Sequence, residues 1–149
     1  MSLLGKSLAA MVVAVAGVSV ANGAGTANAA GGEYGSIATG PYTLAHAVGP
    51  TQAAADRAAL AACGGVVCTV QLRLKGDCGA VAEFDENGLW GRVPAYYYGT
   101  GETAAEARRM ALSQAPPVTP FGTAMSLAFG SSVISPAFIR DTVCTANAG

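Results

Sequence analysis

Charged residues are scarce in this chain. Asp, Glu, Lys and Arg make up 11% of its 149 residues, and the formal net charge is −1. In an ordinary soluble domain about a quarter of the residues are charged. A chain with few basic residues and no net positive charge lacks the electrostatic footprint that attracts nucleic acids or anionic membranes. We therefore expect no nucleic-acid partner.

Histidine is also scarce, since His46 is the only one in the sequence. A triad or general base that needs histidine must use His46, and the G-x-S-x-G motif of many serine hydrolases is absent. The four cysteines lack the paired C-x-x-C spacing of a zinc site, and Asp85, Glu86 and Asn87 lack the rest of a calcium loop. The sequence thus predicts no catalytic residue, no metal site and no cofactor.

The apolar run near the N-terminus is too short to span a bilayer. Residues 8–20 are uncharged, follow Lys6 and fall short of the roughly 20 apolar residues that a transmembrane helix needs. Residues 27–29 read Ala-Asn-Ala, the A-x-A pattern that signal peptidases cleave. We predict that residues 1–29 are a secretory signal peptide and that no transmembrane anchor remains after cleavage. Residues 30–149 then form one domain that is secreted or associated with the cell envelope.

The mature region contains an internal repeat. Residues 35–38 (GSIA) recur as residues 79–82 (GAVA), and residues 51–60 (TQAAADRAAL) match residues 103–112 (TAAEARRMAL) at Thr, Ala and Leu positions. Two degenerate copies of one unit are the simplest explanation. The first copy covers residues 33–78 and the second covers residues 79–144.

Each copy is predicted to contain a strand, a turn, a second strand, a helix and a third strand that ends at a cysteine, Cys78 or Cys144. Val70, Leu72 and Leu74 alternate with polar residues, which indicates a strand with one covered face and one wet face. We therefore predict an α+β fold. Two degenerate β-β-α-β repeats form a mostly antiparallel sheet with two helices on one face.

Turn and cap residues support these elements. Asn87-Gly88 is a strong hairpin signal, because a type I′ turn needs positive φ at both central residues. Thr103 and Glu106 have the spacing of a capping box, and Thr51 has the corresponding place in the first copy. We expect the two helices to begin just after these threonines.

An apolar insertion rich in Pro, Gly and Ser interrupts the second copy at residues 116–136. The first copy has only the short link from Cys63 to Cys68 at the corresponding place. The insertion packs on the domain's own core, contacts a partner or lipid with Phe121 among its apolar side chains, or is disordered. The residues leave these three interpretations open.

Chain geometry restricts the pairing of the cysteines. A strand over residues 70–75 places Cys68 and Cys78 roughly 25–30 Å apart, whereas a disulfide needs Cα atoms about 5–6 Å apart. Cys63 lies close to Cys68 in the sequence and is therefore also distant from Cys78. The remaining pattern pairs Cys63 with Cys68 and Cys78 with Cys144, and export favours oxidised cysteines.

Tyr96, Tyr97 and Tyr98 follow the hairpin signal, and strand alternation sends Tyr97 to the face opposite that of its neighbours. One face is expected to pack on the helices. The side chains on the other face either take part in ordinary packing between strands or lie beside basic side chains on an open sheet face. In the second case they form an aromatic and basic surface of the kind that protein interfaces favour. The candidate binding residues are Tyr97, Arg73, Lys75, Arg92 and Phe121.

Several of these motifs together resemble a known family. They are residues 34–38 (YGSIA), Ala55, Ala59 and Leu60 of the first helix, Cys63, Cys68, residues 78–82 (CGAVA) and Cys144. Their order is similar to that of the domain-of-unknown-function 4189 (DUF4189) family of small secreted bacterial proteins. In that family the second helix ends at a paired cysteine, where this chain has Ala115. The resemblance implies export and disulfides, and it implies no activity.

We expect a non-enzymatic exported domain that acts as a binding or interaction module in the cell envelope or the medium, with an extracellular or envelope protein as its partner. The absence of a catalytic motif favours this function. The alternative is a small extracellular hydrolase that uses His46 or nearby carboxylates such as Asp77, Glu83 and Asp85. A purely structural or storage role is the third possibility.

Overall fold

The computed structural model describes residues 20–21, 27–28, 32–64, 67–88, 91–118 and 136–148. For residues 20–21, 27–28, 86–88 and 91–92 it describes the backbone only. Most of the predicted signal peptide and most of the insertion at 116–136 lie outside these ranges.

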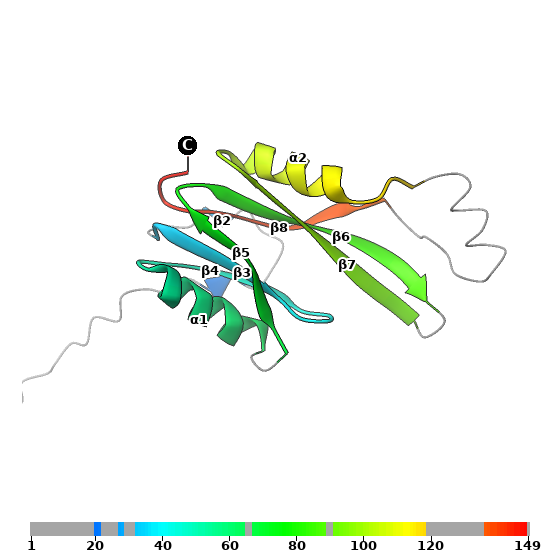
Figure 1. The fold of residues 1–149 in the computed structure, drawn as a ribbon, viewed down its shortest axis with the longest axis horizontal. Coiled ribbons are helices and arrows are strands. Elements are labelled where there is room, and N and C mark those ends of the chain that lie inside the picture. The colour runs from blue at the N-terminus through cyan, green and yellow to red at the C-terminus, as the bar shows by residue number, and fades with distance from the viewer. Residues whose placement is uncertain are drawn as a thin grey trace, which may run out of the picture.

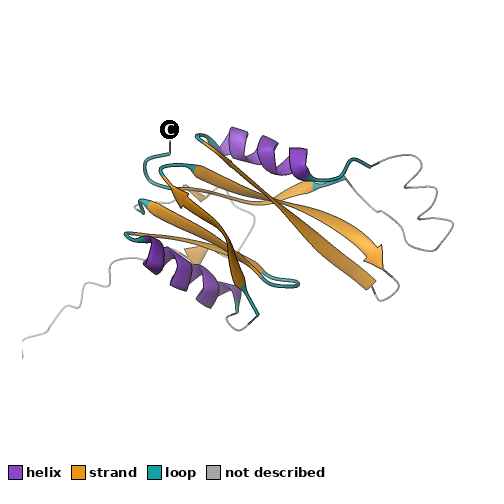
Figure 2. Ribbon diagram, viewed as in Figure 1, coloured by secondary structure: helices purple, strands orange, loops and turns teal. Residues whose placement is uncertain are grey.

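Each repeat folds as a β-β-α-β unit (Figure 1, Figure 2). The first repeat consists of β3 (Tyr34–Thr39), β4 (Leu44–Gly49), α1 (Gln52–Cys63) and β5 (Thr69–Lys75). The second repeat consists of β6 (Cys78–Gly88), β7 (Gly91–Gly101), α2 (Ala104–Gln114) and β8 (Phe138–Cys144). Two short strands, β1 (Val20–Ala21) and β2 (Ala27–Asn28), lie within the predicted signal peptide.

The strands form two sheets, one for each repeat, in the orders β1-β4-β3-β5 and β2-β8-β6-β7. The strands of each repeat pair antiparallel around β3 or β6, and the short β2 pairs parallel with β8. The register with the last strand shifts between Ile37 and Ala38 in β3, and between Val81 and Ala82 in β6. These residues match in the repeated motif, so the irregularity belongs to the duplicated unit.

The two sheets pack face to face, and one helix covers the outer side of each. Larger apolar side chains fill the layer between the sheets, among them Ile37, Leu74, Val81 and Val143. Alanines and cysteines form the layers beneath α1 and α2. Figure 1 shows α1 and α2 on opposite sides of the paired sheets. The core therefore has three layers, one under each helix and one between the sheets.

The α+β class, the two repeats and the mostly antiparallel pairing are confirmed. The sequence predicts one sheet with both helices on one face, whereas the structure divides the strands between two sheets and places the helices on opposite sides. The reason lies in β3, which is buried on both faces from Gly35 to Thr39. A strand buried on both faces needs a layer on each side. The alternation that indicates a wet face occurs in β5, an edge strand, so it does not report on the central strand.

Both helices begin at the predicted caps. Thr51 Oγ1 accepts a hydrogen bond from the Ala54 N–H at 3.2 Å, and Thr103 Oγ1 accepts one from the Glu106 N–H at 3.3 Å. The Glu106 carboxylate accepts a hydrogen bond from the Glu102 N–H at 3.1 Å. Side-chain acceptors thus satisfy backbone donors at the start of each helix, which stabilises it.

The predicted hairpin between β6 and β7 forms, but Asn87-Gly88 is not its turn. Asn87 pairs with Arg92 and Gly88 pairs with Gly91, so both residues belong to the end of β6. The strands are joined through residues 89–90, which lie outside the described residues.

Both predicted disulfides are present. Cys63 and Cys68 join the end of α1 to the start of β5, with Cα atoms 6.1 Å apart. Cys78 and Cys144 are cross-strand neighbours on β6 and β8, with Cα atoms 4.0 Å apart. The expectation that the third strand of the first copy ends at Cys78 is wrong, because β5 ends at Lys75 and Cys78 begins β6. The long bridge therefore lies within the second sheet.

Candidate functional site

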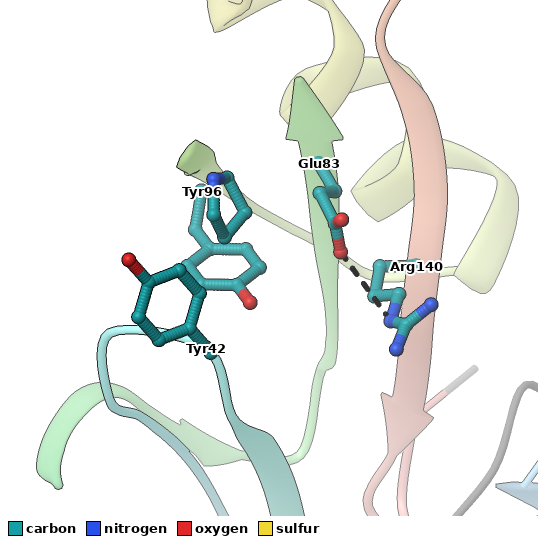
Figure 3. Close-up of a pocket in the computed structure, with 5 residues that line it drawn as sticks. Tyr42, Glu83, Tyr96 and Arg140 are labelled. Atoms are coloured by element: carbon teal, nitrogen blue, oxygen red, sulfur yellow. Dashed lines mark ion pairs between the residues drawn. The ribbon is translucent and has the colours of Figure 1, made fainter. Parts of the chain in front are cut away.

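A pocket opens where the first repeat's hairpin meets the inner face of the second sheet. It has a volume of about 300 Å³ and is lined by Tyr42, Glu83, Pro94, Tyr96 and Arg140 (Figure 3). Tyr42 belongs to the turn between β3 and β4, and the other residues lie on β6, β7 and β8. Both repeats therefore contribute to this pocket, and it exists only when they are packed together.

Strand register places Glu83 and Tyr96 in the pocket. The two residues are direct cross-strand partners on β6 and β7. Glu83 follows Val81 by two residues, and Val81 packs between the sheets. Because alternate residues of a strand share a face, Glu83 continues the inner face of the second sheet toward the pocket.

Arg140 reaches the pocket because β8 carries an extra residue. Asp141 and Ile139 pair with consecutive residues of β6, so Arg140 is the residue that the register skips. Such a bulge interrupts the alternation of side chains and re-aims one of them. Ile139 packs with the cluster under α2, while Arg140 Nε lies 3.4 Å from Glu83 Oε2.

The Glu83–Arg140 ion pair has a buried partner and an accessible partner. Glu83 is 5% exposed, whereas the Arg140 side chain is 54% exposed. A carboxylate only accepts hydrogen bonds and a guanidinium only donates them, and both form charge-assisted bonds. The pocket therefore offers an acceptor at its base and donors at its rim.

Two tyrosines form the aromatic side of the pocket, opposite the ion pair in Figure 3. Tyr42 is 71% exposed, and Tyr96 is partly buried. Burial raises the pKa of Tyr96, and the negative charge of Glu83 raises it further. The phenol therefore keeps its proton at neutral pH, and its O–H is a donor as well as an acceptor.

His46 meets Asp141 in the layer between the sheets. His46 Nδ1 lies 2.5 Å from Asp141 Oδ2, and the two residues are 2% and 7% exposed. Asp141 Oδ1 accepts a further hydrogen bond from the Thr142 N–H at 2.8 Å. The single histidine is thus placed as a buried link between β4 of the first repeat and β8 of the second.

Of the carboxylates considered from the sequence, Asp77 lies apart from Glu83 and Asp85. Asp77 lies in the turn before β6, where its Oδ1 accepts a backbone hydrogen bond at 2.7 Å. Glu83 lies roughly 20 Å further along this extended strand, at about 3.4 Å per residue, so the two do not form a pair. Glu83 instead shares its face of β6 with Asp85, which is also buried. The side chains of Glu86 and Asn87 lie outside the described part of the chain.

Tyr97 lies on the helix side of the second sheet and packs with the alanines under α2. Tyr96 and Tyr98 are on the inner side, as the alternation predicts. The first sheet packs against this inner side. The open sheet face expected from the sequence is therefore covered, and the inner face is accessible at the pocket.

Arg73 and Lys75, the basic candidates, lie on the first sheet and are not brought together with Tyr97. Arg73 forms an ion pair with Asp56 at 2.9 Å. Lys75 Nζ lies 5.5 Å from the centroid of a tyrosine ring at the start of β3. The other two candidates, Phe121 and the side chain of Arg92, lie outside the described residues.

Asp56 is the centre of a polar network between α1 and the first sheet. It accepts hydrogen bonds from Ser36 Oγ at 2.5 Å, from Gln52 Nε2 at 3.0 Å and from Arg73 Nε at 2.9 Å. Burial by itself would raise the pKa of Asp56, but these hydrogen bonds and the Arg73 charge outweigh it and hold the pKa below its ordinary value. The carboxylate thus stays charged and anchors the helix to its sheet.

Sequence reasoning did not identify Tyr42, Pro94 or Arg140 as pocket residues. They come together only when the two repeats pack and when β8 is bulged. One signal was available, because Glu83 and Asp85 alternate with apolar residues and therefore lie on one face of the predicted strand.

The described residues contain no group of three or more His, Cys, Asp or Glu that could hold a metal ion. No helix among them has the length and the hydropathy that a bilayer span requires.

Comparison with known proteins identifies one family. No curated protein and no solved structure matches the chain. The model of a domain of unknown function, DUF4189, matches residues 34–117, which is more than half of the chain. The chain therefore belongs to the DUF4189 family.

Proposed function

We propose that the protein is an exported, non-enzymatic binding module of the cell envelope or the medium, and that the pocket between its repeats is the binding site. The observation that carries this proposal is the lining of the pocket, where two tyrosines face a Glu–Arg ion pair. Tyrosine and arginine are enriched among the residues that dominate binding energy at interfaces.

The pocket is held by rigid elements. Glu83, Tyr96 and Arg140 lie on neighbouring paired strands, and the disulfide between Cys78 and Cys144 joins two of these strands. A preformed site loses little conformational entropy when a ligand binds. This rigidity supports a binding role for the second sheet.

Export is supported by the cysteines and by the predicted signal peptide at residues 1–29. The four cysteines of the sequence are all engaged in the two disulfides, which persist in oxidising compartments. We expect the exported protein to begin at Ala30, as measured by intact mass spectrometry of the secreted or envelope fraction. A chain that retains residues 1–29 there would contradict cleavage at this site.

Partner capture tests the binding function. The purified, oxidised protein is immobilised and exposed to the envelope fraction and the culture fluid of the producing cell. We expect it to retain an extracellular or envelope partner, and we expect Tyr42→Ala to lose that partner. Tyr42 is suited to this test because it is highly exposed, so its truncation leaves the core intact.

The matched control is Met110→Ala. Met110 is an exposed apolar residue on α2, which covers the opposite side of the second sheet. Thermal unfolding of each variant verifies that the fold is retained. Equal retention of the partner by Tyr42→Ala and by wild type would refute the pocket as the binding site, and no retained partner at all would refute an extracellular or envelope partner.

A further inference from the structure

The charged groups that line the pocket cancel. They are the Glu83 carboxylate and the half-exposed Arg140 guanidinium, which form an ion pair and offset each other's charge. Electrostatic complementarity with this lining favours a polar ligand that carries no net charge.

The polar groups of the pocket match the hydrogen-bonding capacity of hydroxyl groups. A hydroxyl both donates and accepts, whereas the Glu83 carboxylate only accepts and the Arg140 guanidinium only donates. Neighbouring hydroxyls of one ligand can therefore donate to Glu83 and accept from Arg140 at the same time. Both bonds are charge-assisted, and the ion pair need not separate to form them.

The tyrosines supply an apolar wall on the other side. Tyr42 and Tyr96 line the pocket together, away from the ion pair (Figure 3). The faces of aromatic rings carry partial negative charge and pack favourably against C–H groups. A saturated ring with C–H groups on its face and hydroxyls at its edge could contact the tyrosines and the ion pair together.

The size of the pocket is consistent with one such ring. Its volume of about 300 Å³ lies at the lower end of the range for small-molecule sites, about 300–1,000 Å³. We propose that the pocket binds a carbohydrate, with one sugar ring packed on Tyr42 and Tyr96 and its hydroxyl groups bridging Glu83 and Arg140. This inference rests on the proposed binding function and names the ligand class of the same pocket.

Calorimetric titration of the purified, oxidised protein with cellotetraose, maltotetraose and chitotetraose tests the inference. We expect saturable binding of at least one of these neutral oligosaccharides, and about tenfold weaker binding by Tyr42→Ala, because the truncation removes one of the two rings of the aromatic wall. The matched control is Tyr34→Ala, because Tyr34 lies at the far end of β3 from the Tyr42 turn. We expect this control to keep the wild-type affinity.

A second variant separates the aromatic wall from the hydroxyl group. Tyr96→Phe keeps the ring that packs against the neighbouring apolar cluster and removes only the phenol oxygen. We expect this variant to fold and to bind the same oligosaccharide more weakly than wild type does, but more strongly than Tyr42→Ala does.

Failure of the carbohydrate assignment can be distinguished from failure of the binding function. The assignment is overturned if no oligosaccharide binds, if Tyr42→Ala binds as well as wild type, or if tetralysine or inorganic phosphate binds at the pocket instead. A partner that is captured in a Tyr42-dependent way without any oligosaccharide binding overturns the ligand class alone. Absence of both captured partner and oligosaccharide binding overturns the binding function as well.

Discussion

At the scale of single residues, the His46–Asp141 pair is a buried polar contact between the two sheets, in the same layer as the apolar side chains that pack there. Removing one partner of a buried hydrogen-bonded pair leaves the other without compensation for its lost hydration. We expect Asp141→Ala to lower the free energy of unfolding by about 2–4 kcal/mol. Urea denaturation at neutral pH measures this loss.

The double variant His46→Leu with Asp141→Leu is the matched control. Replacing both members of a buried pair by apolar residues of similar volume is often neutral or stabilising. We therefore expect the double variant to unfold at a higher urea concentration than Asp141→Ala. If the double variant were as unstable as the single one, the loss would not come from the unpaired partner.

Asp56 gives the first repeat a defined pH dependence. The pKa of Asp56 is lower in the folded protein than the ordinary value of 3.8. The contribution of Asp56 to the free energy of unfolding is therefore present above that value and is lost as the pH falls through the folded-state pKa. The paired Arg73 is exposed to solvent, which limits the contribution to about 0.5–1 kcal/mol. We expect Asp56→Asn to lower the free energy of unfolding by this amount near neutral pH and by less in acid.

Urea unfolding of wild type and Asp56→Asn, near neutral pH and well below the ordinary carboxyl pKa, measures the difference. Glu33→Gln removes an exposed carboxylate outside the network and serves as the control. Two stability curves that run parallel over the whole pH range would contradict the role assigned to Asp56.

At the scale of elements, the two helices lie at different distances from their sheets. A Cβ atom at Gly99 of β7 would lie 2.2 Å from the Ala111 nitrogen and 2.4 Å from the Ala107 carbonyl oxygen, both in the backbone of α2. The corresponding residue of the first repeat is Ala47, which carries a Cβ under α1 and is fully buried. The second helix therefore lies closer to its sheet, and glycine permits this approach.

We expect Gly99→Ala to push α2 away from β7 and to lower the free energy of unfolding by about 1–3 kcal/mol, because the atoms that clash belong to backbone and cannot rotate aside. Ala47→Gly is the reciprocal change in the first repeat, and we expect it to cost about 0.5–1 kcal/mol. Both values come from urea denaturation. A loss from Gly99→Ala that is no greater than that from Ala47→Gly would contradict the close approach of α2.

Elements with a local signal could be predicted from the sequence. Thr51 and Thr103 mark the helix starts because a cap needs only residues a few positions apart. The sheet division could not be predicted in this way. In β3 the small residues Gly35, Ser36 and Ala38 are as buried as Ile37, and small side chains give no hydrophobic alternation to read.

The pocket could be predicted only in part, for a reason that also lies in the elements. The acidic alternation of Glu83 and Asp85 is visible in the sequence. The position of Arg140 depends on a bulge in β8, and that of Tyr42 depends on the packing of one repeat against the other. Neither the bulge nor the packing of the repeats has a sequence signal within a few residues of the side chain that it positions.

At the scale of the whole molecule, each disulfide supports one side of the pocket. The bridge from Cys78 to Cys144 joins the strands that carry Glu83 and Arg140. The bridge from Cys63 to Cys68 contacts Thr43, whose Oγ1 lies 3.3 Å from Cys63 Sγ and 3.5 Å from Cys68 Sγ. Thr43 follows Tyr42 directly in the turn, so this bridge lies behind the aromatic wall.

The two bridges should differ in their effect on stability. They span 5 and 66 residues, and by loop-closure entropy they stabilise the folded state by about 2 and about 4 kcal/mol. We expect the double variant Cys78→Ala with Cys144→Ala to lose more free energy of unfolding than Cys63→Ala with Cys68→Ala, as measured by urea denaturation.

The Cys63/Cys68 variant should still fold. Because it loosens the turn that carries Tyr42, we expect it to retain less partner than wild type does in the capture experiment. Equal stability losses would contradict the entropic account, and undiminished capture by the folded Cys63/Cys68 variant would show that the short bridge does not support the pocket.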